Sequence, residues 1–270
     1  MMAGGRATLG VVVITKDEAS NIAECLDTVK WADEMIVVDA QSTDKTADIA
    51  RTYTELVYIR PWPGFGRQKN FGIDQARSDW ILILDADERV EQALAEEILE
   101  MLSSPPSDAA AFRVPRQNYF YGQWVRWGGA YPDYQIRIFR RGLATYNDIA
   151  IHENLLVEGQ VQTFSSPLKH YTERHITDHF RKFNLYTSLA ASEKRKSCHS
   201  VAWHHLICHP FVIFFKTYVL KRGYRDGTRG VIFAVFASLY TFVKYAKLYE
   251  SMLTPPEGRR RGSRESDRHA

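Results

Sequence analysis

The chain has 270 residues, of which 45% are hydrophobic and 25% are charged, and its formal net charge is +3. This is ordinary globular composition, and the net charge is too small to indicate nucleic-acid binding by itself. The cysteines, Cys25, Cys198 and Cys208, are far apart and form no Cys-x-x-Cys pair. The sequence therefore predicts neither a disulfide framework nor a zinc site, and it favours a reducing cytosol.

The amino-terminal apolar run is short and is followed at once by Lys16, Asp17 and Glu18, so we expect no signal peptide. From here strands and helices alternate. Strands are expected over 9–15, 35–38 and 55–59, and helices over 21–29, 43–53 and 67–77. This alternation predicts parallel strands joined by right-handed crossovers, as in a Rossmann-like α/β sheet.

The most informative segment is Trp80–Val90. Its apolar run, Ile81–Leu84, is typical of a strand that is buried on both faces, and Asp85 and Asp87 follow directly. In open α/β sheets, ligands bind at the carboxyl ends of the strands. Paired carboxylates there suit a hard divalent cation, which commonly binds together with a phosphate. The segment predicts an enzyme that acts on a phosphorylated or nucleotide-linked substrate.

The pattern changes after a helix expected over 91–102. A linker at 105–107 precedes short strands expected over 111–114, 135–139 and 155–157. An amphipathic helix follows over 176–189, and further helices are expected over 203–221 and 228–249.

Several ordered segments together make the chain resemble the family 2 glycosyltransferases, which have the GT-A fold. In finer detail it resembles the lipopolysaccharide-core β-1,4-glucosyltransferase subgroup, and the resemblance extends to about Glu250. The segments are Ile14–Glu18, Val38–Asp39, Ser42–Asp44, Arg67–Asn70, Asp85–Asp87, Gln135–Arg140, Ile151–Glu153 and Lys244–Leu248.

The resemblance implies a GT-A domain over 1–200, with a mainly parallel central sheet flanked by helices. From the residues themselves we expect an amphipathic, membrane-associating helical extension over 201–250 and a disordered basic tail over 251–270. The resemblance also implies inverting, metal-dependent transfer of a hexose, with UDP-glucose as donor and an inner-core heptose of lipopolysaccharide as acceptor. Gln135–Arg140 does not match the Gln-x-x-Arg-Trp signature of processive synthases, so we expect a non-processive enzyme.

The expected metal is Mg²⁺ or Mn²⁺. Held by Asp87, it would neutralise the diphosphate leaving group, and Asp85 would share its water shell or bind the ribose. As in several GT-A enzymes, His170 could complete the metal shell, although a lone histidine is more often a packed or surface residue. The alternative for the acidic pair is a solvated turn.

The family places a base-reading aspartate at Asp39, with Thr15 and Glu18 lining the base and the ribose. Asp39 could instead only begin the turn before the next helix. Arg67 and Lys69 could contact ribose or phosphate if their helix starts where predicted, or could be solvated.

An inverting transfer needs a base that takes the proton from the acceptor hydroxyl. The family's acidic base falls in the segment that contains Glu153, so this residue is the candidate, with Asp133 and Asp148 as rivals. His152 could position Glu153.

The apolar, aromatic runs 211–220 and 231–243 are flanked by lysines and arginines. Each is shorter than the about 20 residues that span a bilayer, so we expect interfacial helices on the cytoplasmic face of the inner membrane. Packing against the sheet or a second subunit is the alternative.

Two rival functions remain at this point. A haloacid-dehalogenase-type phosphatase would use Asp85 as its nucleophile, but that family carries the motif on its first strand and needs a later acidic cluster that is missing here. A peripheral membrane scaffold without catalysis would leave Asp39, Asp85 and Asp87 unexplained.

Overall fold

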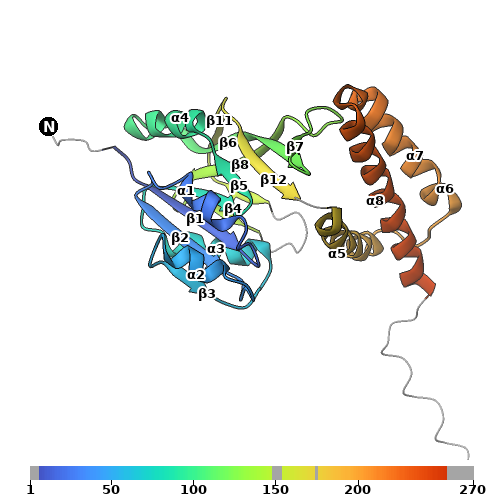
Figure 1. Ribbon diagram of the computed structural model, residues 1–270, viewed down its shortest axis with the longest axis horizontal. Helices are drawn as coiled ribbons and strands as arrows, with labels where there is room; N and C mark the ends of the chain where they lie inside the picture. The colour runs from blue at the N-terminus through green and yellow to red at the C-terminus, as the bar shows by residue number, and fades with distance from the viewer. Residues whose placement is uncertain (1–5, 148–153, 174–175, 254–270) are drawn as a thin grey trace, which may run out of the picture. The chain divides into compact units, whose positions relative to one another are not determined.

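The computed structural model describes residues 6–147, 154–173 and 176–253 (Figure 1). The chain divides into two compact units, Met1–Arg174 and His175–Ala270. The helix that begins at Ile176 therefore packs within the second unit, whereas the resemblance places it in a domain that ends at residue 200.

The first half of the first unit is a parallel sheet. Its strands are β1 (Leu9–Thr15), β2 (Glu34–Asp39), β3 (Val57–Ile59) and β4 (Trp80–Asp85), in the order β3-β2-β1-β4. Helices α1 (Ile22–Asp27), α2 (Thr46–Arg51) and α3 (Phe65–Gln75) connect them. The predicted Rossmann-like alternation is confirmed over this half.

Beyond β4 the sheet becomes mixed, and it continues in the order β4-β8-β6-β12-β5. Strand β8 is antiparallel to both β4 and β6, and β12 is parallel to β6 but antiparallel to β5. The elements are β5 (Glu88–Val90), α4 (Gln92–Ser103), β6 (Ala109–Phe120), β7 (Gln123–Trp124), β8 (Asp133–Arg140), β11 (Gln160–Thr163) and β12 (Leu168–Glu173). Strands β9 (Ala144–Tyr146) and β10 (Leu155–Val157) form a separate antiparallel pair.

The position of β5 shows that this sheet curls. Only Ala86 and Asp87 separate β4 from β5 along the chain, yet β8, β6 and β12 lie between them in the sheet. From Asp85 to Glu88 the chain reaches at most about 11 Å. Four strand-to-strand steps in a flat sheet would need about 19 Å. The strands must therefore curl back, and the acidic turn closes the curl.

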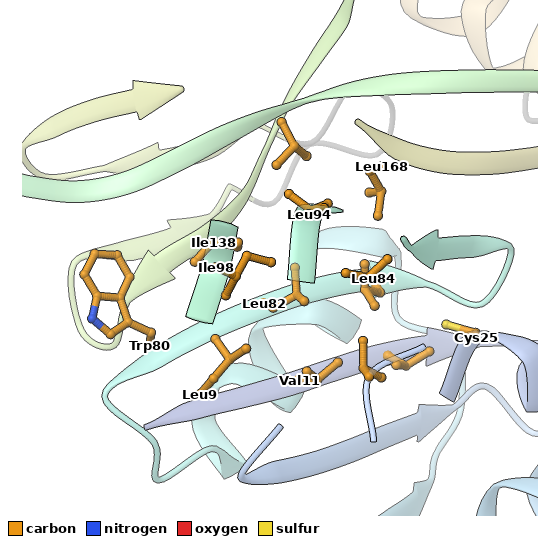
Figure 2. Close-up of a cluster of buried hydrophobic side chains, with 14 of the residues drawn as sticks. Leu9, Val11, Cys25, Trp80, Leu82, Leu84, Leu94, Ile98, Ile138 and Leu168 are labelled. Carbon is orange, nitrogen blue, oxygen red and sulfur yellow. The ribbon is translucent and has the colours of Figure 1, made fainter. Parts of the chain in front are cut away.

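Strands β1 and β4 are buried on both faces of the sheet, which explains their continuous apolar runs. On one face, side chains of β1 and β4 pack with α1 and with Leu94 and Ile98 of α4 (Figure 2). On the other face, Val12 and Ile14 of β1 pack with Ile73 of α3. These helices hold the carboxyl ends of β1, β2 and β4 in register.

The second unit is helical. It contains α5 (Ile176–Arg195), α6 (Trp203–Leu206), α7 (Cys208–Phe215), a π-helical segment at Lys216–Leu220, a 3₁₀ turn at Gly223–Asp226 and α8 (Thr228–Leu253). Helices α5 and α7 both pack against α8 (Figure 1). Among the described residues, α8 is the helix long and apolar enough to cross a membrane by length and composition. The sequence run 231–243 is shorter because Lys244 interrupts it, whereas the helix continues to Leu253.

Candidate active site

Three of the predicted site residues lie side by side at the carboxyl ends of adjacent strands. Thr15 of β1 is opposite Asp39 of β2, and Ile14 of β1 is opposite Asp85 of β4. Ligands bind at this edge in α/β sheets. The sheet therefore brings Thr15, Asp39 and Asp85 to one place, as the sequence predicts.

Asp85 is clamped between two buried cations. Nη2 of Arg137 donates a hydrogen bond of 2.9 Å to Oδ2 of Asp85, and Nζ of Lys69 lies 3.7 Å from Oδ1. Burial alone would raise the pKa of Asp85, but Lys69 and Arg137 outweigh it and hold this pKa well below its usual range. Asp85 is therefore a permanently charged anchor.

Glu88 lies beneath this clamp and is completely buried. Its Oε1 accepts a hydrogen bond of 2.5 Å from Nη2 of Arg137 and lies 3.6 Å from Nη1 of Arg116, while its Oε2 accepts the backbone N–H of Asp85 at 3.0 Å. Burial disfavours the charged form of Arg137, but Glu88 and Asp85 more than compensate and raise its pKa. Glu88 thus fixes both the backbone of Asp85 and the guanidinium that binds its side chain.

Asp133 belongs to the same network. Its Oδ2 accepts a hydrogen bond of 2.7 Å from Nη2 of Arg116, and its Oδ1 accepts one of 2.7 Å from Gln135. Although burial opposes ionisation, Arg116 and Gln135 lower the pKa of Asp133. A carboxylate with a low pKa and both oxygens engaged is a weak proton acceptor, which counts against Asp133 as the general base.

Asp87 faces His170 across the turn. Nε2 of His170 lies 3.5 Å from Oδ1 of Asp87, and Nδ1 lies 2.7 Å from Oδ1 of Asn118. The amide of Asn118 donates to Ala130 and Asp133 through Nδ2, so its oxygen must face His170. Nδ1 of His170 therefore carries the proton, and in the neutral ring the lone pair of Nε2 points to the carboxylate of Asp87.

The Asp87 carboxylate and the His170 imidazole could bind a divalent cation whose other ligands come from a substrate. A carboxylate oxygen and an imidazole nitrogen converge, and the histidine is oriented through its other nitrogen, as metal-binding histidines usually are. Within the described part of the chain, no group of three or more His, Cys, Asp or Glu side chains could hold a metal. Mg²⁺ and Mn²⁺ commonly bind with few protein ligands plus phosphates and water, and Asp87 would supply the carboxylate ligand for either ion. The imidazole of His170 suits Mn²⁺ better than Mg²⁺, which prefers oxygen ligands.

The expected nucleotide-binding residues differ in whether their side chains already have hydrogen-bond partners within the protein. The hydroxyl of Thr15 is buried and has no hydrogen-bond partner, which leaves it available to a ligand. Asp39 is fully buried, and its carboxylate accepts hydrogen bonds from the backbone N–H (2.8 Å) and the hydroxyl (2.5 Å) of Ser42. Asp39 therefore starts the turn before α2, which is the alternative role that the sequence leaves open. Oε2 of the half-buried Glu18 accepts a hydrogen bond of 2.6 Å from Asn21.

Lys69 and Arg67, both on α3, differ in their burial. Lys69 is buried, with its ammonium group near Asp85 and 5.0 Å from the ring centroid of Tyr146, whereas Arg67 is exposed. Residues two positions apart on an α-helix point in different directions, so Arg67 does not share the buried position of Lys69 beside Asp85. The sequence pairs them because it shows only that both are basic.

The predicted base Glu153 lies outside the described residues, as do His152 and the rival Asp148. The described flanking residues are paired: the backbone N–H of Asn147 donates to the carbonyl of Asn154, and the backbone N–H of Asn154 donates to Oδ1 of Asn147. Asn70 of α3, next to Lys69, holds the backbone of Tyr146 by hydrogen bonds of 2.8 and 2.9 Å.

Sequence reasoning missed Glu88, Arg116, Asn118 and Arg137 as site residues. Two signals were present. Glu88 directly follows the acidic pair, and Arg137 interrupts the apolar run of β8. Their role depends on the curl of the sheet, because β5, β6 and β8 come together only in three dimensions.

Comparison with known proteins agrees with this geometry. Residues 10–154 match the family described as Glycosyl transferase family 2. The chain is a family 2 glycosyltransferase with the GT-A fold. This membership removes the phosphatase and scaffold alternatives.

Individual relatives cover most of the chain. It is 28% identical to the lipopolysaccharide core biosynthesis glycosyltransferase LpsC of Rhizobium meliloti, over 90% of this chain and 92% of that protein. It is 27% identical to an uncharacterized glycosyltransferase of Rickettsia typhi, over 91% and 88%. A mannosyltransferase from Pyrobaculum calidifontis, solved with GDP-Man and Mn²⁺, superposes with a TM-score of 0.52 at 16% identity, covering 90% of this chain and 87% of that one.

Proposed function

We propose that this enzyme transfers one hexose, glucose from UDP-glucose, to a saccharide hydroxyl of the lipopolysaccharide inner core, with inversion of the anomeric carbon and without processivity. The observation that carries the proposal is the convergence of Asp87 and His170 beside the clamped Asp85 at the carboxyl edge of the sheet. The similarity to a lipopolysaccharide core glycosyltransferase supports the acceptor class.

The site supplies both signs of charge that a nucleoside diphosphate with a cation requires. Asp87 and His170 would hold Mg²⁺ or Mn²⁺, which when bound neutralises charge on the departing diphosphate. Lys69 and Arg137 both contact Asp85 and would attract phosphate oxygens. A related fold solved with a nucleotide sugar and Mn²⁺ is consistent with this arrangement.

Nucleoside recognition is assigned to the ends of β1 and β2. The unpartnered hydroxyl of Thr15 would bind the nucleoside, and Glu18 lies in the loop that follows. Asp39 would read the base only after it exchanges its hydrogen bonds with Ser42 for bonds to the ligand. Arg67 is exposed, so a ribose contact would have to form at the rim of the site.

Glu153 is the proposed general base, on the strength of the resemblance and because Asp133 is bound by Arg116. Glu153→Gln should preserve binding of the sugar nucleotide and remove most of the transfer. Asp133→Asn is the matched comparison. Loss of donor binding in Glu153→Gln, or retained transfer, would refute the assignment.

A lipid-linked acceptor implies that the enzyme works as a peripheral protein at the cytoplasmic face of the inner membrane. The apolar character of α8 agrees with a membrane location.

The decisive experiment is a donor screen with the purified protein. UDP-, GDP- and ADP-sugars are tested with Mn²⁺ or Mg²⁺ for nucleotide release in the presence of lipopolysaccharide acceptor fractions. We expect UDP release that depends on metal and acceptor, and Asp87→Asn should lower it by about 10²- to 10³-fold. The control is Asp108→Asn, an exposed acid before β6 that should leave activity unchanged. Metal-independent turnover in the wild type, or an active Asp87→Asn enzyme, would contradict the proposal.

A further inference from the structure

In a surface helix of a globular protein the apolar face is usually buried, but helix α7 exposes its large apolar side chains. Its exposed positions, Cys208, Phe211, Val212 and Phe215, have the i, i+3, i+4, i+7 spacing of one helix face. The side chain of Phe211 is 68% exposed, whereas Pro210 is buried against α8, where its carbonyl accepts a hydrogen bond of 2.9 Å from Ser238. The large apolar side chains of α7 thus lie on the face opposite to the one that packs against α8.

The exposed face continues beyond both ends of α7. Trp203 and Ile207, which precede it, are 69% and 63% exposed, and Val219 and Leu220 of the π-helical segment are also exposed. We call these residues together the α7 face: Trp203, Ile207, Cys208, Phe211, Val212, Phe215, Val219 and Leu220. So many contiguous exposed apolar side chains mark a binding surface rather than scattered surface residues.

Helix α8 shows the same inversion. Its buried side includes Gly230 and Ala234, and a Cβ atom at Gly230 would lie 1.8 Å from the carbonyl oxygen of Gly223. Val231, Val235 and Phe242 are exposed instead. In the first turns of α8, small residues therefore lie inside and larger apolar residues outside, which is a feature of helices that pack in an apolar surrounding, whereas Tyr245 and Leu248 are buried nearer its end.

The positive charge of the second unit indicates which kind of partner the α7 face fits. Between Ser197 and Tyr249 there are seven Lys and Arg residues and a single acid, Asp226, which is buried. Exposed cations follow the α7 face along the chain: Lys216 in the π-helical segment, Lys221, Arg222 and Arg225 just after it, and Arg229 at the start of α8. An apolar face bordered by cations matches a bilayer with anionic headgroups.

The packing of α5 against α8 indicates that α8 does not cross the bilayer. The ring of His179 of α5 packs at a tilt against Phe236 of α8 with ring centroids 4.1 Å apart, and Lys247 of α8 binds Asn184 and Ser188 of α5. α5 carries several charges and is too polar for the hydrocarbon core. Because α5 accompanies α8 over this length, α8 cannot be surrounded by lipid.

We propose that the α7 face lies in the plane of an anionic bilayer, with its apolar side chains below the headgroups and the cations of the following turn at the headgroup level. This inference deepens the proposed membrane location, but it is independent of the donor and acceptor chemistry.

The first test is flotation of the full-length protein with phosphatidylcholine vesicles, with and without phosphatidylglycerol. We expect binding that needs the anionic lipid and that falls more than about tenfold in the triple variant Ile207→Ser, Phe211→Ser, Phe215→Ser. The matched control removes three exposed apolar residues of the first unit, Tyr134→Ser, Leu156→Ser, Val161→Ser, and should float like the wild type. Lys216→Gln with Lys221→Gln should lose the preference for anionic vesicles. Equal flotation of the two triple variants would overturn the proposal.

The second test measures depth. In a Cys198→Ser background, a fluorophore on the exposed Cys208 reports from within the α7 face, since Cys25 is buried. Lipid nitroxides near the headgroups should quench it more than nitroxides at the bilayer centre, and the reverse order would refute in-plane docking.

Light scattering without lipid tests the alternative that the α7 face binds a second copy of the chain. A wild-type dimer that the apolar triple variant dissociates would assign the α7 face to a second copy of the chain and reject the membrane proposal.

The flotation result and the donor screen are separable. An enzyme that turns over UDP-glucose with a soluble acceptor fragment but does not float disproves only the docking inference. A protein that floats but releases no nucleotide from any donor in the presence of acceptor disproves only the proposed transfer.

Discussion

The two units of this protein break the usual distribution of polar and apolar side chains in opposite directions. The first unit buries charges: Glu88, Arg137 and Lys69 have almost no exposed surface. The second unit exposes apolar side chains, among them Trp203 and Phe211. Charged residues are seldom fully buried unless paired, and large exposed apolar patches are uncommon on monomers.

Each departure has a cost that the fold alone does not require, so each indicates a function. Buried charges are preorganised for charged substrate groups that arrive without much water. Exposed apolar side chains remain unfavourable until another apolar phase covers them. The difference agrees with our proposals that the first unit carries the reactive site and the second unit the docking surface, and the following experiments test that separation.

The largest expected effect is on stability in the buried network. Arg137→Met leaves Glu88 without its nearest cation, so it should lower the free energy of unfolding by about 3–5 kcal/mol. Urea unfolding measures this. The exposed pair partner Arg51 offers a control, because Arg51→Met should cost no more than about 1 kcal/mol. Adding Glu88→Gln to Arg137→Met should recover part of the loss, and simple additivity would show that the two residues are not coupled.

The second expected effect is on catalysis, and it compares two basic residues of α3, Lys69 and Arg67. Lys69→Met removes a cation beside Asp85 and should lower kcat/KM by about 10²-fold or more, whereas the exposed Arg67→Met should change it by less than about threefold. Steady-state kinetics of nucleotide release measure both. If Arg67→Met is the more damaging, the charge that matters lies at the rim rather than in the buried clamp.

The third effect is a pH dependence of stability. The folded-state pKa of Asp133 lies below its unfolded value, so its contribution is fully present above the unfolded pKa of about 4 and is lost as the pH falls toward the folded value. The contribution changes by at most about 1.4 kcal/mol per pH unit for one proton. Asp133→Asn should flatten the acid limb when unfolding is measured between pH 6 and 3. Parallel curves for the two proteins would mean that Asp133 is not favourably paired.

The smallest expected effect concerns the α7 face. Phe211→Ala removes a side chain that is already exposed, so the free energy of unfolding in solution should change by no more than about 0.5 kcal/mol. Leu84→Ala in the core of the first unit should cost about 2–5 kcal/mol. Thermal unfolding compares them. A large loss for Phe211→Ala would show that this face packs within the protein.

Much of the candidate site could be predicted because it lies next to recognisable strands. Asp85 and Asp87 follow a run of β4 that is apolar enough to be identified alone, and Thr15 ends another such run. Of the two cations that contact Asp85, Lys69 is among the predicted site residues, but Arg137 could not be found this way. Arg137 is far away along the chain, and its importance comes from a distance of 2.9 Å that depends on how β8 pairs with β4.

The sequence by itself determined the alternating α/β half, the acidic turn after β4 and the apolar character of the carboxyl-terminal helices, because each depends on local periodicity. Tertiary structure alone decided that Lys69 turns inward while Arg67 stays exposed, that Asp39 is bound by Ser42, and that Glu88 closes the curl of a mixed sheet. It also decided which faces of α7 and α8 remain uncovered. The physical reason is that periodicity shows which side chains share a face, whereas only packing between distant segments determines what that face meets.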